Sequence, residues 1–373
     1  MKIVQVLPSL DVGGMERLVI AMAREQQKQG HQPAIYCLER AGTMADQLEA
    51  LEIPVIVFGK GPGFSLSVVG EMARRLRAVR PDVVHTHNAL VHHYGVLAAK
   101  MAGVPVIVNT RHGYGNFGWD ARRERIFNTT AHWTDAIVMV TQGVQEYFVT
   151  RQGIPSTRTR VILNGADLEP FLARPAAPGT RRPVVRFGTV GRLHAAKNHV
   201  LLVRAFRDVL ASVPGAELHI LGEGECRSEM EAAIAELGLA SRVHLHGYSP
   251  DVAGFLQTLD LFVLSSSSEG LPLAVIEAMA AGLPIVSTRM PGVEDVAPEG
   301  DVAWYCRPGD AVELAAAMTR AASHPDLASP GAEARRLARR FSTANMWREY
   351  ERLFHSLLQT KGAVFAAGGC SAA

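Results

Sequence analysis

The sequence predicts an α/β protein built from two doubly wound, parallel-sheet domains, and three observations support this prediction. Short runs of β-branched and aliphatic residues alternate with longer stretches of helical periodicity, which is the pattern of β-α-β units. The alternation stops at residues 168–183, which contain four prolines and several alanines, a composition typical of a linker. Beyond this linker the same alternation starts again.

The first domain is expected over residues 1–167 and the second over residues 184–343. In the first domain, strands are expected at 3–7, 34–38, 55–58, 82–84, 104–108 and 136–140, with a helix at 15–29 that Gly30 ends. In the second domain, strands are expected at 184–190, 217–221, 243–245, 261–264 and 284–287, with helices at 197–212, 226–237 and 273–281. An amphipathic helix is expected at 344–360, and the small, glycine-containing tail at 361–373 is expected to be disordered.

Composition places the chain among ordinary globular proteins. Of 373 residues, 48% are hydrophobic and 20% charged, and the net charge of +2 argues neither for nor against nucleic acid as a partner. The four scattered cysteines form no CxxC pair, which is typical of a reducing compartment. No run approaches ~18 apolar residues, and the apolar start is too short for a signal peptide. We therefore expect a cytoplasmic protein without a transmembrane helix.

Two cations follow the first strand of the second domain. Ligands of open parallel sheets bind beyond the carboxyl ends of the strands. Here the strand ends in Gly191-Arg192-Leu193, and Lys197 opens the next helix. A helix N-terminus favours phosphate, arginine can bind two phosphate oxygens, and lysine supplies a point charge. Arg192 and Lys197 are therefore candidate diphosphate-binding residues, and the alternative is a pair of solvated surface cations.

Two further strand ends of this domain carry glycines and carboxylates. The strand at 217–221 is followed by Gly222-Glu223-Gly224, and the strand at 261–264 by four serines and then Glu269-Gly270-Leu271-Pro272. Glu277 lies on the helix that follows. Ionised carboxylates only accept hydrogen bonds, which suits a polyhydroxyl ligand. The alternatives are a helix-start charge for Glu269 and a solvated helix residue for Glu277.

The first domain offers a second set of candidates. Gly13 and Gly14 precede the first helix and form a backbone-lined candidate anion site. His85 and His87 follow the strand at 82–84, and His112 follows the strand at 104–108, so we expect all three at strand ends. Histidine can transfer a proton near neutral pH. A structural role is the alternative for each of these histidines.

Zinc is a further alternative for the histidines of this domain. Four of them lie within nine residues: His85, His87, His92 and His93. No cysteine lies nearby, however, and the sequence contains no His-Glu-x-x-His motif. Zinc is therefore the weaker interpretation of this cluster.

Together these motifs resemble the retaining glycosyltransferases of family four, the group 1 enzymes with the GT-B fold, which include enzymes of exopolysaccharide synthesis. The matching elements are Gly13-Gly14-Met15-Glu16, His112, Gly191-Arg192-Leu193 with Lys197, Gly222-Glu223-Gly224, and Glu269-Gly270-Leu271-Pro272 with Glu277. The resemblance runs over nearly the whole chain, without the last dozen or so residues. It implies two Rossmann-like domains that face each other across a cleft, with the helix at 344–360 crossing back to the first domain.

The resemblance also implies roles for the candidate residues. Arg192 and Lys197 would bind the diphosphate of a nucleotide-sugar donor, a UDP-sugar by default and a GDP-sugar as the alternative. His112 and Glu269 would contact the transferred sugar, and Glu277 the ribose. The remaining members of the donor site would be Gly13, Gly14, Gly222, Gly224, Tyr248, Gly270 and Leu271. Transfer would proceed with retention and, because no Asp-x-Asp triplet is present, without a metal or other cofactor.

The acceptor is expected to be a sugar or a lipid-linked precursor, as in family members that build bacterial polysaccharides. Arginines of the first domain are candidate contacts with the inner face of the membrane, with solvated helix faces as the alternative: Arg74, Arg75, Arg77, Arg122 and Arg123. Two other enzyme classes stay open, an NAD-dependent oxidoreductase and a sugar-nucleotide epimerase. Glu39 would be the ribose-binding acid of the former, but the first loop lacks Gly-x-Gly-x-x-Gly.

Overall fold

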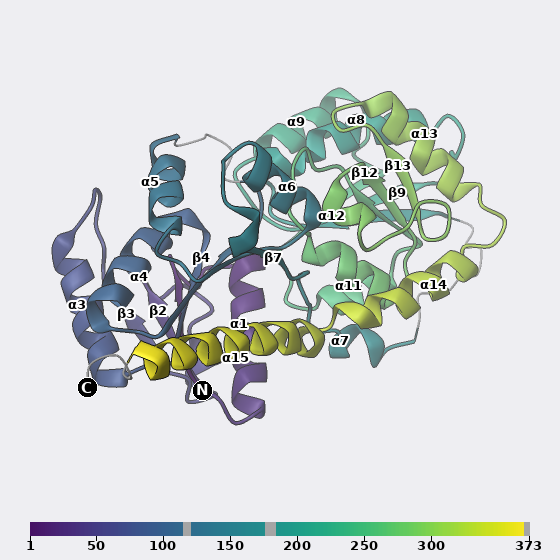
Figure 1. The fold of residues 1–373 in the computed structure, drawn as a ribbon. Coiled ribbons are helices and arrows are strands. Elements are labelled where there is room, and N and C mark those ends of the chain that lie inside the picture. Colours follow the sequence, from purple (N-terminus) through teal and green to yellow (C-terminus); the bar gives the residue numbers. More distant parts are fainter. Residues whose placement is uncertain (115–120, 176–183, 369–373) are drawn as a thin grey trace. The chain divides into compact units, whose positions relative to one another are not determined.

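A computed structural model describes residues 1–114, 121–175 and 184–368 of the chain. The chain divides into two compact units, and the final helix belongs to the first of them (Figure 1). Unit 1 comprises residues 1–165 with 343–373, and unit 2 comprises residues 166–342. Each unit is a parallel sheet flanked by helices, so the α/β fold class is confirmed.

In its described part, unit 1 has a seven-stranded parallel sheet with the order β3-β2-β1-β4-β5-β6-β7. The strands are β1 (Lys2–Leu7), β2 (Gln32–Cys37), β3 (Val55–Val57), β4 (Val83–His87), β5 (Val106–Arg111), β6 (Ala136–Met139) and β7 (Thr159–Val161). The helices are α1 (Gly14–Lys28), α2 (Asp46–Glu49), α3 (Leu66–Val79), α4 (Asn88–Ala102), α5 (Ala121–Ala131), α6 (Gln142–Thr150), the short η1 (Ser156–Arg158) and α15 (Thr343–Gly368). Strand order reverses direction at β1 and β4, which is where open parallel sheets bind ligands.

The closing helix α15 is anchored to unit 1 by buried aromatic residues. Its fully buried Trp347 donates a hydrogen bond from Nε1 to Gln29 Oε1 at 3.2 Å, just beyond the end of α1. Glu351 on the same helix pairs with His31 at 2.8 Å. The helix continues to Gly368, within the segment 361–373 that is expected to be disordered.

Unit 2 has a six-stranded parallel sheet in its described residues, with the order β10-β9-β8-β11-β12-β13. The strands are β8 (Arg186–Val190), β9 (Glu217–Leu221), β10 (Val243–Gly247), β11 (Leu261–Leu264), β12 (Ile285–Thr288) and β13 (Ala303–Cys306). The helices are α7 (Glu169–Leu172), α8 (His199–Val209), α9 (Arg227–Glu236), α10 (Val252–Gln257), α11 (Leu273–Ala281), α12 (Pro291–Glu294), α13 (Ala311–Ala322) and α14 (Ala328–Ala338), with the short η2 (Ala195–Lys197) and η3 (Arg339–Phe341). The helix α7 lies inside the stretch that composition predicts as linker.

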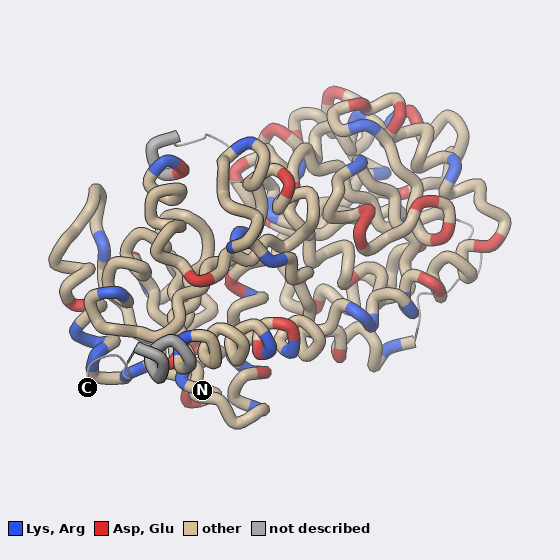
Figure 2. Tube along the Cα trace, in the orientation of Figure 1, with Lys and Arg blue, Asp and Glu red and all other residues tan. Residues whose placement is uncertain are grey.

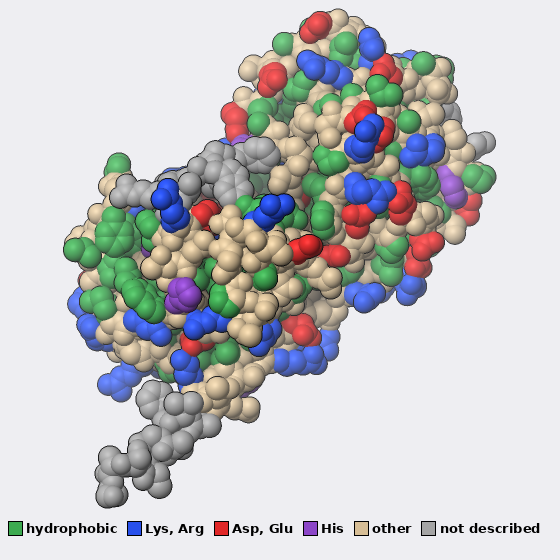
Figure 3. All heavy atoms as spheres, turned by 45° about the horizontal axis from the view of Figure 1, so that its top comes forward, with side chains coloured by type: hydrophobic (Ala, Val, Ile, Leu, Met, Phe, Trp, Pro, Cys, Tyr) green, Lys and Arg blue, Asp and Glu red, His purple; other side chains and the backbone are tan. Residues whose placement is uncertain are grey.

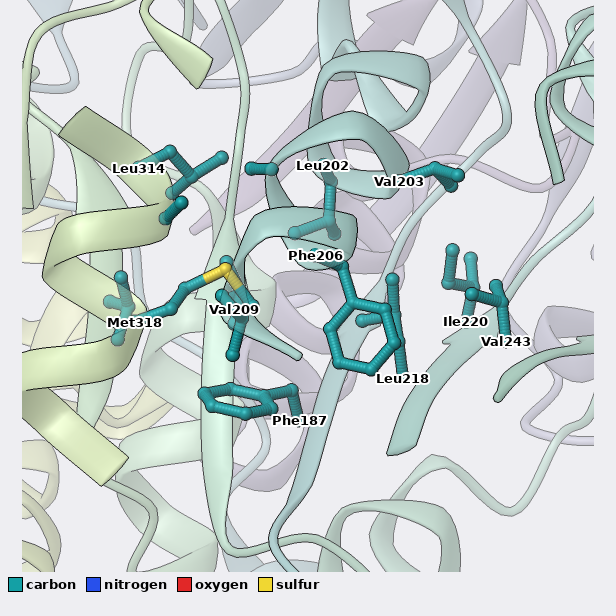
Figure 4. Close-up of a cluster of buried hydrophobic side chains, with 14 of the residues drawn as sticks. Phe187, Leu202, Val203, Phe206, Val209, Leu218, Ile220, Val243, Leu314 and Met318 are labelled. Carbon is teal, nitrogen blue, oxygen red and sulfur yellow. The ribbon is translucent and has the colours of Figure 1, made fainter. Parts of the chain in front are cut away.

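One face of the unit 2 sheet packs against α8 and α13 in a dry core (Figure 4). Phe187 on β8 meets Phe206 on α8 with ring centroids 6.2 Å apart, and both are fully buried. Leu218 and Ile220 on β9 point into the same cluster. Burying a large apolar side chain contributes ~1.5–3 kcal/mol, so this core is a rigid platform for the loops at the strand ends.

Candidate functional site

The loops after β8 and β9 are held together by backbone contacts that require glycine. Gly222 has a φ of +149°, and a Cβ on it would lie 1.9 Å from the carbonyl oxygen of Gly191. A Cβ on Gly224 would lie 2.3 Å from the carbonyl oxygen of Leu193. The Leu193 amide in turn donates to the Glu223 carbonyl at 3.0 Å. Gly222 and Gly224, both predicted donor-site residues, therefore allow the two loops to approach each other closely.

Lys197 and Glu269 meet in unit 2. Lys197, in η2, forms an ion pair with Glu269, and both side chains are largely buried. Ser266 Oγ donates to Glu269 Oε1 at 2.9 Å, and Ser265 Oγ donates to the Lys197 carbonyl at 2.8 Å. The structure thus brings together the loops after β8 and β11, as the sequence motifs predicted. A largely buried lysine whose charge is balanced by one carboxylate can exchange that partner for another anion.

The Arg192 side chain has a different partner from that of Lys197. Its guanidinium pairs with Glu225 at 3.3 Å, and the side chain is 67% exposed. His194 Nε2 lies 3.5 Å from the same carboxylate. The sequence analysis missed Glu225, although it directly follows the Gly-Glu-Gly motif. Arg192 is therefore free to move to an incoming anion at little cost, because exposed ion pairs contribute only ~0–1 kcal/mol.

The remaining predicted donor residues occupy different environments. Glu277 on α11 is only 2% exposed, so the alternative of a solvated helix residue is wrong. Gly270 and Leu271 are buried just before that helix. Tyr248, after β10, is 64% exposed. Thr288, at the end of β12, donates a hydrogen bond to the Ser266 carbonyl at 2.7 Å and so holds the loop that follows β11 in place.

In unit 1, the glycines before α1 leave the start of that helix open. Gly13 is its N-cap in an extended conformation, and no side chain caps it. A Cβ on Gly13 would lie 2.2 Å from Glu16 Oε2, so Glu16 folds back over this glycine, whereas a Cβ on Gly14 would meet nothing within 4 Å. Burial raises the pKa of Glu16.

His85 and His87 lie within β4, which extends three residues beyond the predicted strand end at Val84, and both are fully buried. His87 is the last residue of this strand and so lies at a strand end as expected, whereas His85 lies inside it. The strand was predicted too short because polar residues were taken to end it, whereas here they form hydrogen bonds to neighbouring strands. His85 Nε2 lies 2.7 Å from Thr110 Oγ1, which lies 2.9 Å from the Tyr350 hydroxyl on α15. Burial lowers the pKa of His85 to about 3, so its ring is neutral.

His87 connects Gln5 on β1 to His112 after β5. His87 Nε2 lies 2.8 Å from Gln5 Oε1, and His87 Nδ1 lies 2.9 Å from His112 Nε2. Since Gln5 Oε1 can only accept, His87 donates from Nε2, and its Nδ1 must accept from His112 Nε2. The Nδ1 of His112 is then the unprotonated nitrogen. Burial lowers the pKa of His112 to about 3, so it serves as a neutral hydrogen-bonding group.

The residue before His112 is a buried cation that the sequence analysis missed. Arg111 is 1% exposed, pairs with Glu124 at 2.8 Å, and packs against the rings of Phe127 and Phe148, at 4.7 and 4.5 Å from their centroids. These contacts fix the backbone that carries His112. A buried arginine whose aromatic neighbours lie far along the chain leaves no local sequence signal.

The structure also bears on the histidine-zinc alternative and on the basic groups. His92 bridges Thr86 and Thr134 at 2.9 and 3.0 Å, so it is engaged in structural hydrogen bonds like His85 and His87.

Arg74 and Arg75 both pair with Glu71 on α3, where Figure 2 shows acidic and basic residues together. Arg77 donates to the Met101 carbonyl at 2.7 Å. The side chains of Arg122 and Arg123 lie outside the described residues.

The charge distribution of one face and the apolarity of the helices bear on the expected membrane contact. On the face drawn in Figure 3, Lys and Arg side chains are interspersed with Asp and Glu. Within the described residues, no helix has the length and apolarity needed to span a bilayer.

Two Rossmann-like units with glycine-shaped strand ends and a lysine–glutamate pair define a glycosyltransferase of the GT-B class, and comparisons with known proteins specify its family. Residues 12–170 match the model described as Glycosyltransferase Family 4, and residues 184–324 match that described as Glycosyl transferases group 1. The chain belongs to this family of glycosyltransferases.

Curated relatives agree with this assignment. The chain is 28% identical over 235 residues to the Escherichia coli UDP-Gal:alpha-D-GlcNAc-diphosphoundecaprenol alpha-1,3-galactosyltransferase, covering 58% of this chain and 60% of that protein. It is 28% identical over 316 residues to the Xanthomonas campestris GDP-mannose:cellobiosyl-diphosphopolyprenol alpha-mannosyltransferase, covering 79% and 80%.

Solved structures show the same fold. The Anabaena HepE structure in complex with UDP and glucose superposes with a TM-score of 0.84 at 21% identity, covering 95% of this chain and 100% of that one. Sucrose-phosphate synthase from Thermosynechococcus elongatus superposes with a TM-score of 0.81 at 18% identity, covering 96% and 99%. The family assignment takes the place of the oxidoreductase and epimerase alternatives.

Proposed function

We propose that this glycosyltransferase moves one sugar from a nucleoside-diphosphate-sugar to a sugar carried on a polyprenyl diphosphate, with retention and without a metal ion. The observation that carries the proposal is the largely buried ion pair of Lys197 and Glu269 at adjoining strand ends of unit 2. Without a ligand, the carboxylate balances the lysine charge. With a donor bound, the diphosphate would take over that role, and Glu269 would accept hydrogen bonds from the sugar hydroxyls.

The transfer step requires positive charge beside the leaving phosphate. Negative charge grows on the leaving phosphate as the bond from the anomeric carbon breaks, and preorganised cations there stabilise the transition state more than the ground state. Lys197 is preorganised because Ser265 holds its carbonyl and Glu269 its ammonium group. Arg192, being exposed, would join when the donor arrives. These two charges make a divalent ion unnecessary in this proposal.

Retention is proposed without a protein nucleophile. The leaving phosphate would accept the proton of the acceptor hydroxyl as that oxygen attacks the same face of the sugar. A glycosidase-type pair would need two carboxyl groups ~5–9.5 Å apart across one bond. Glu277 is buried on α11, whereas Glu269 lies in the preceding loop against Lys197, which does not suit such a pair.

Relatives suggest the classes of donor and acceptor. The two curated relatives above are named for UDP-galactose and GDP-mannose, and both for acceptors on a diphosphopolyprenol and for alpha products. We take UDP-sugars as the first donors to test and GDP-sugars as the second. A lipid-linked acceptor would bring the enzyme to a membrane surface during turnover.

The test uses the full chain with EDTA present. UDP- and GDP-sugars are each combined with a synthetic polyprenyl-diphosphate monosaccharide, and product is detected by mass spectrometry as a gain of one sugar residue. NMR of the new anomeric centre then reports its configuration. We expect one donor to give an α-linked product. Donor consumption without sugar gain on any acceptor, or a product of inverted configuration, would contradict the proposal.

A further inference from the structure

We propose that unit 2 carries a zinc-binding site formed by Glu217, His219 and His244, separate from the strand-end loops of the transferase site. The three residues lie on the neighbouring strands β9 and β10, and the register places His244 directly beside His219. One potential ligand atom from each residue lies within 4.8 Å of the others. Neither the family match nor the transfer chemistry assigns any role to these residues.

Strand alternation places the three ligands on one face of the sheet. Leu218, Ile220 and Val243 point into the core shown in Figure 4. Successive side chains of a strand point to opposite faces, so Glu217, His219 and His244 project from the other face. All three are partly exposed, and β10 is an edge strand, so an ion could reach them.

The hydrogen bonds around His219 match those of a metal-bound imidazole. Its Nε2 lies 3.2 Å from Glu217 Oε2, and its Nδ1 lies 3.0 Å from His246 Nε2. Metal-binding histidines generally donate their second ring N–H to an acceptor, which fixes the ring orientation. His246 supplies that acceptor and is itself braced by Phe255, with ring centroids 5.3 Å apart. With zinc on His219 Nε2, the single ring proton would lie on Nδ1 and be donated to His246 Nε2.

Zinc binds neutral imidazole and ionised carboxylate, and a basic side chain already pairs with the Glu217 carboxylate. Arg186 shares this carboxylate at 3.2 Å and is 39% exposed, so it can move into solvent when an ion binds.

The ligand set selects the kind of metal. Two imidazoles and one carboxylate favour Zn²⁺ over Mg²⁺ or Ca²⁺, which prefer oxygen ligands. Three protein ligands leave a fourth tetrahedral position for water or an outside group. Glu217 begins β9 and Gly222 follows its end, a separation of roughly 16 Å at ~3.3 Å per residue. Zinc here would therefore not contact the donor diphosphate, and chelators should leave transfer intact.

Isothermal titration of untagged, chelator-dialysed protein with zinc sulfate tests the proposal. We expect one ion per chain, and at least about tenfold weaker binding in both His244→Ala and Glu217→Gln, with a smaller loss in His246→Ala. The exposed His355→Ala and the thiol variant Cys226→Ser are controls that should bind zinc normally. Circular dichroism establishes that each variant is folded.

X-ray absorption of the zinc-loaded protein provides a second readout, in which we expect nitrogen and oxygen neighbours and no sulfur. Saturable binding that the His219→Ala/His244→Ala double variant leaves unchanged would overturn the proposal. Sulfur in the first coordination shell, or the absence of any saturable binding, would do so as well.

Discussion

At the scale of single residues, the account depends on Lys197 having a replaceable partner. Glu269 neutralises Lys197, while Ser266 holds the carboxylate in place. In the proposed mechanism Glu269 has two functions, to hold the lysine side chain in position before the donor arrives and to release it afterwards. This dual role predicts opposite effects on binding and on turnover.

Glu269→Gln should separate these effects. Removing the competing carboxylate frees Lys197, so UDP or GDP should bind about fivefold more tightly, equivalent to ~1 kcal/mol for a lost ion pair. Turnover should nevertheless fall, because the neutral amide oxygen of glutamine accepts hydrogen bonds from the sugar hydroxyls more weakly than a carboxylate does. Isothermal titration and steady-state kinetics measure the two effects, with Glu313→Gln, whose glutamate pairs with Arg307 on the same unit, as the matched control. Weaker nucleotide binding in Glu269→Gln would contradict the proposed competition.

The buried histidines of unit 1 make its stability depend on pH. Burial lowers the pKa of His85 and His112 to about 3 and that of His87 well below its usual value. The unfolded chain, with histidine pKa values near 6.5, therefore binds more protons than the folded chain below that pH. Their contribution to stability is complete above about pH 6.5 and is lost as pH falls toward about 3.

Urea unfolding of unit 1 should thus become easier between pH 7.5 and pH 5.5, by on the order of 1 kcal/mol per pH unit for each histidine below its unfolded pKa. His87→Gln, which keeps a hydrogen-bonding side chain, should reduce this slope. The exposed His355→Gln on α15 should not change it. An equal pH dependence in wild type and His87→Gln would show that these histidines are not held neutral.

At the scale of elements, the loops after β8 and β9 act as one backbone-paired unit. The methyl group of Gly222→Ala would clash with the Gly191 carbonyl oxygen. It would also force alanine into a backbone conformation with a φ of +149°, which residues other than glycine rarely adopt. We expect a loss of about 1–3 kcal/mol in stability and weaker nucleotide binding. Gly70→Ala, in α3 with nothing within 4 Å, should stabilise by up to ~1 kcal/mol. Chemical denaturation checks both, and an unaffected Gly222→Ala would contradict the close approach.

The sequence allowed the alternating elements and the strand-end motifs to be predicted, because periodicity and glycine placement are local signals. It did not show that β4 extends through His87, since its histidines find hydrogen-bond partners in Gln5 on β1, Thr110 on β5 and His112 after β5. Neither the packing of Arg111 against two aromatic rings nor the pairing of His219 with His244 has a local signature. Both depend on which strands become neighbours.

At the scale of the whole molecule, the family assignment and the lysine–glutamate pair lead to one claim. We propose that a nucleoside diphosphate is bound and that its developing charge is stabilised by protein cations alone, chiefly Lys197. Ligand-linked stabilisation follows RT ln(1 + [L]/Kd), about 2.7 kcal/mol at a hundredfold excess over Kd. The correct nucleotide-sugar should therefore raise the melting temperature in EDTA. If the nucleotide-sugar raises the melting temperature only when Mg²⁺ or Mn²⁺ is added, the proposal of metal-independent binding is wrong.

The most direct measurement compares turnover of wild type, Lys197→Ala and the exposed-lysine control Lys100→Ala with the identified donor in EDTA. The account predicts a loss on the order of 10²-fold or more in Lys197→Ala, with circular dichroism unchanged, and near-normal turnover in Lys100→Ala. Wild-type turnover in a folded Lys197→Ala protein would contradict it.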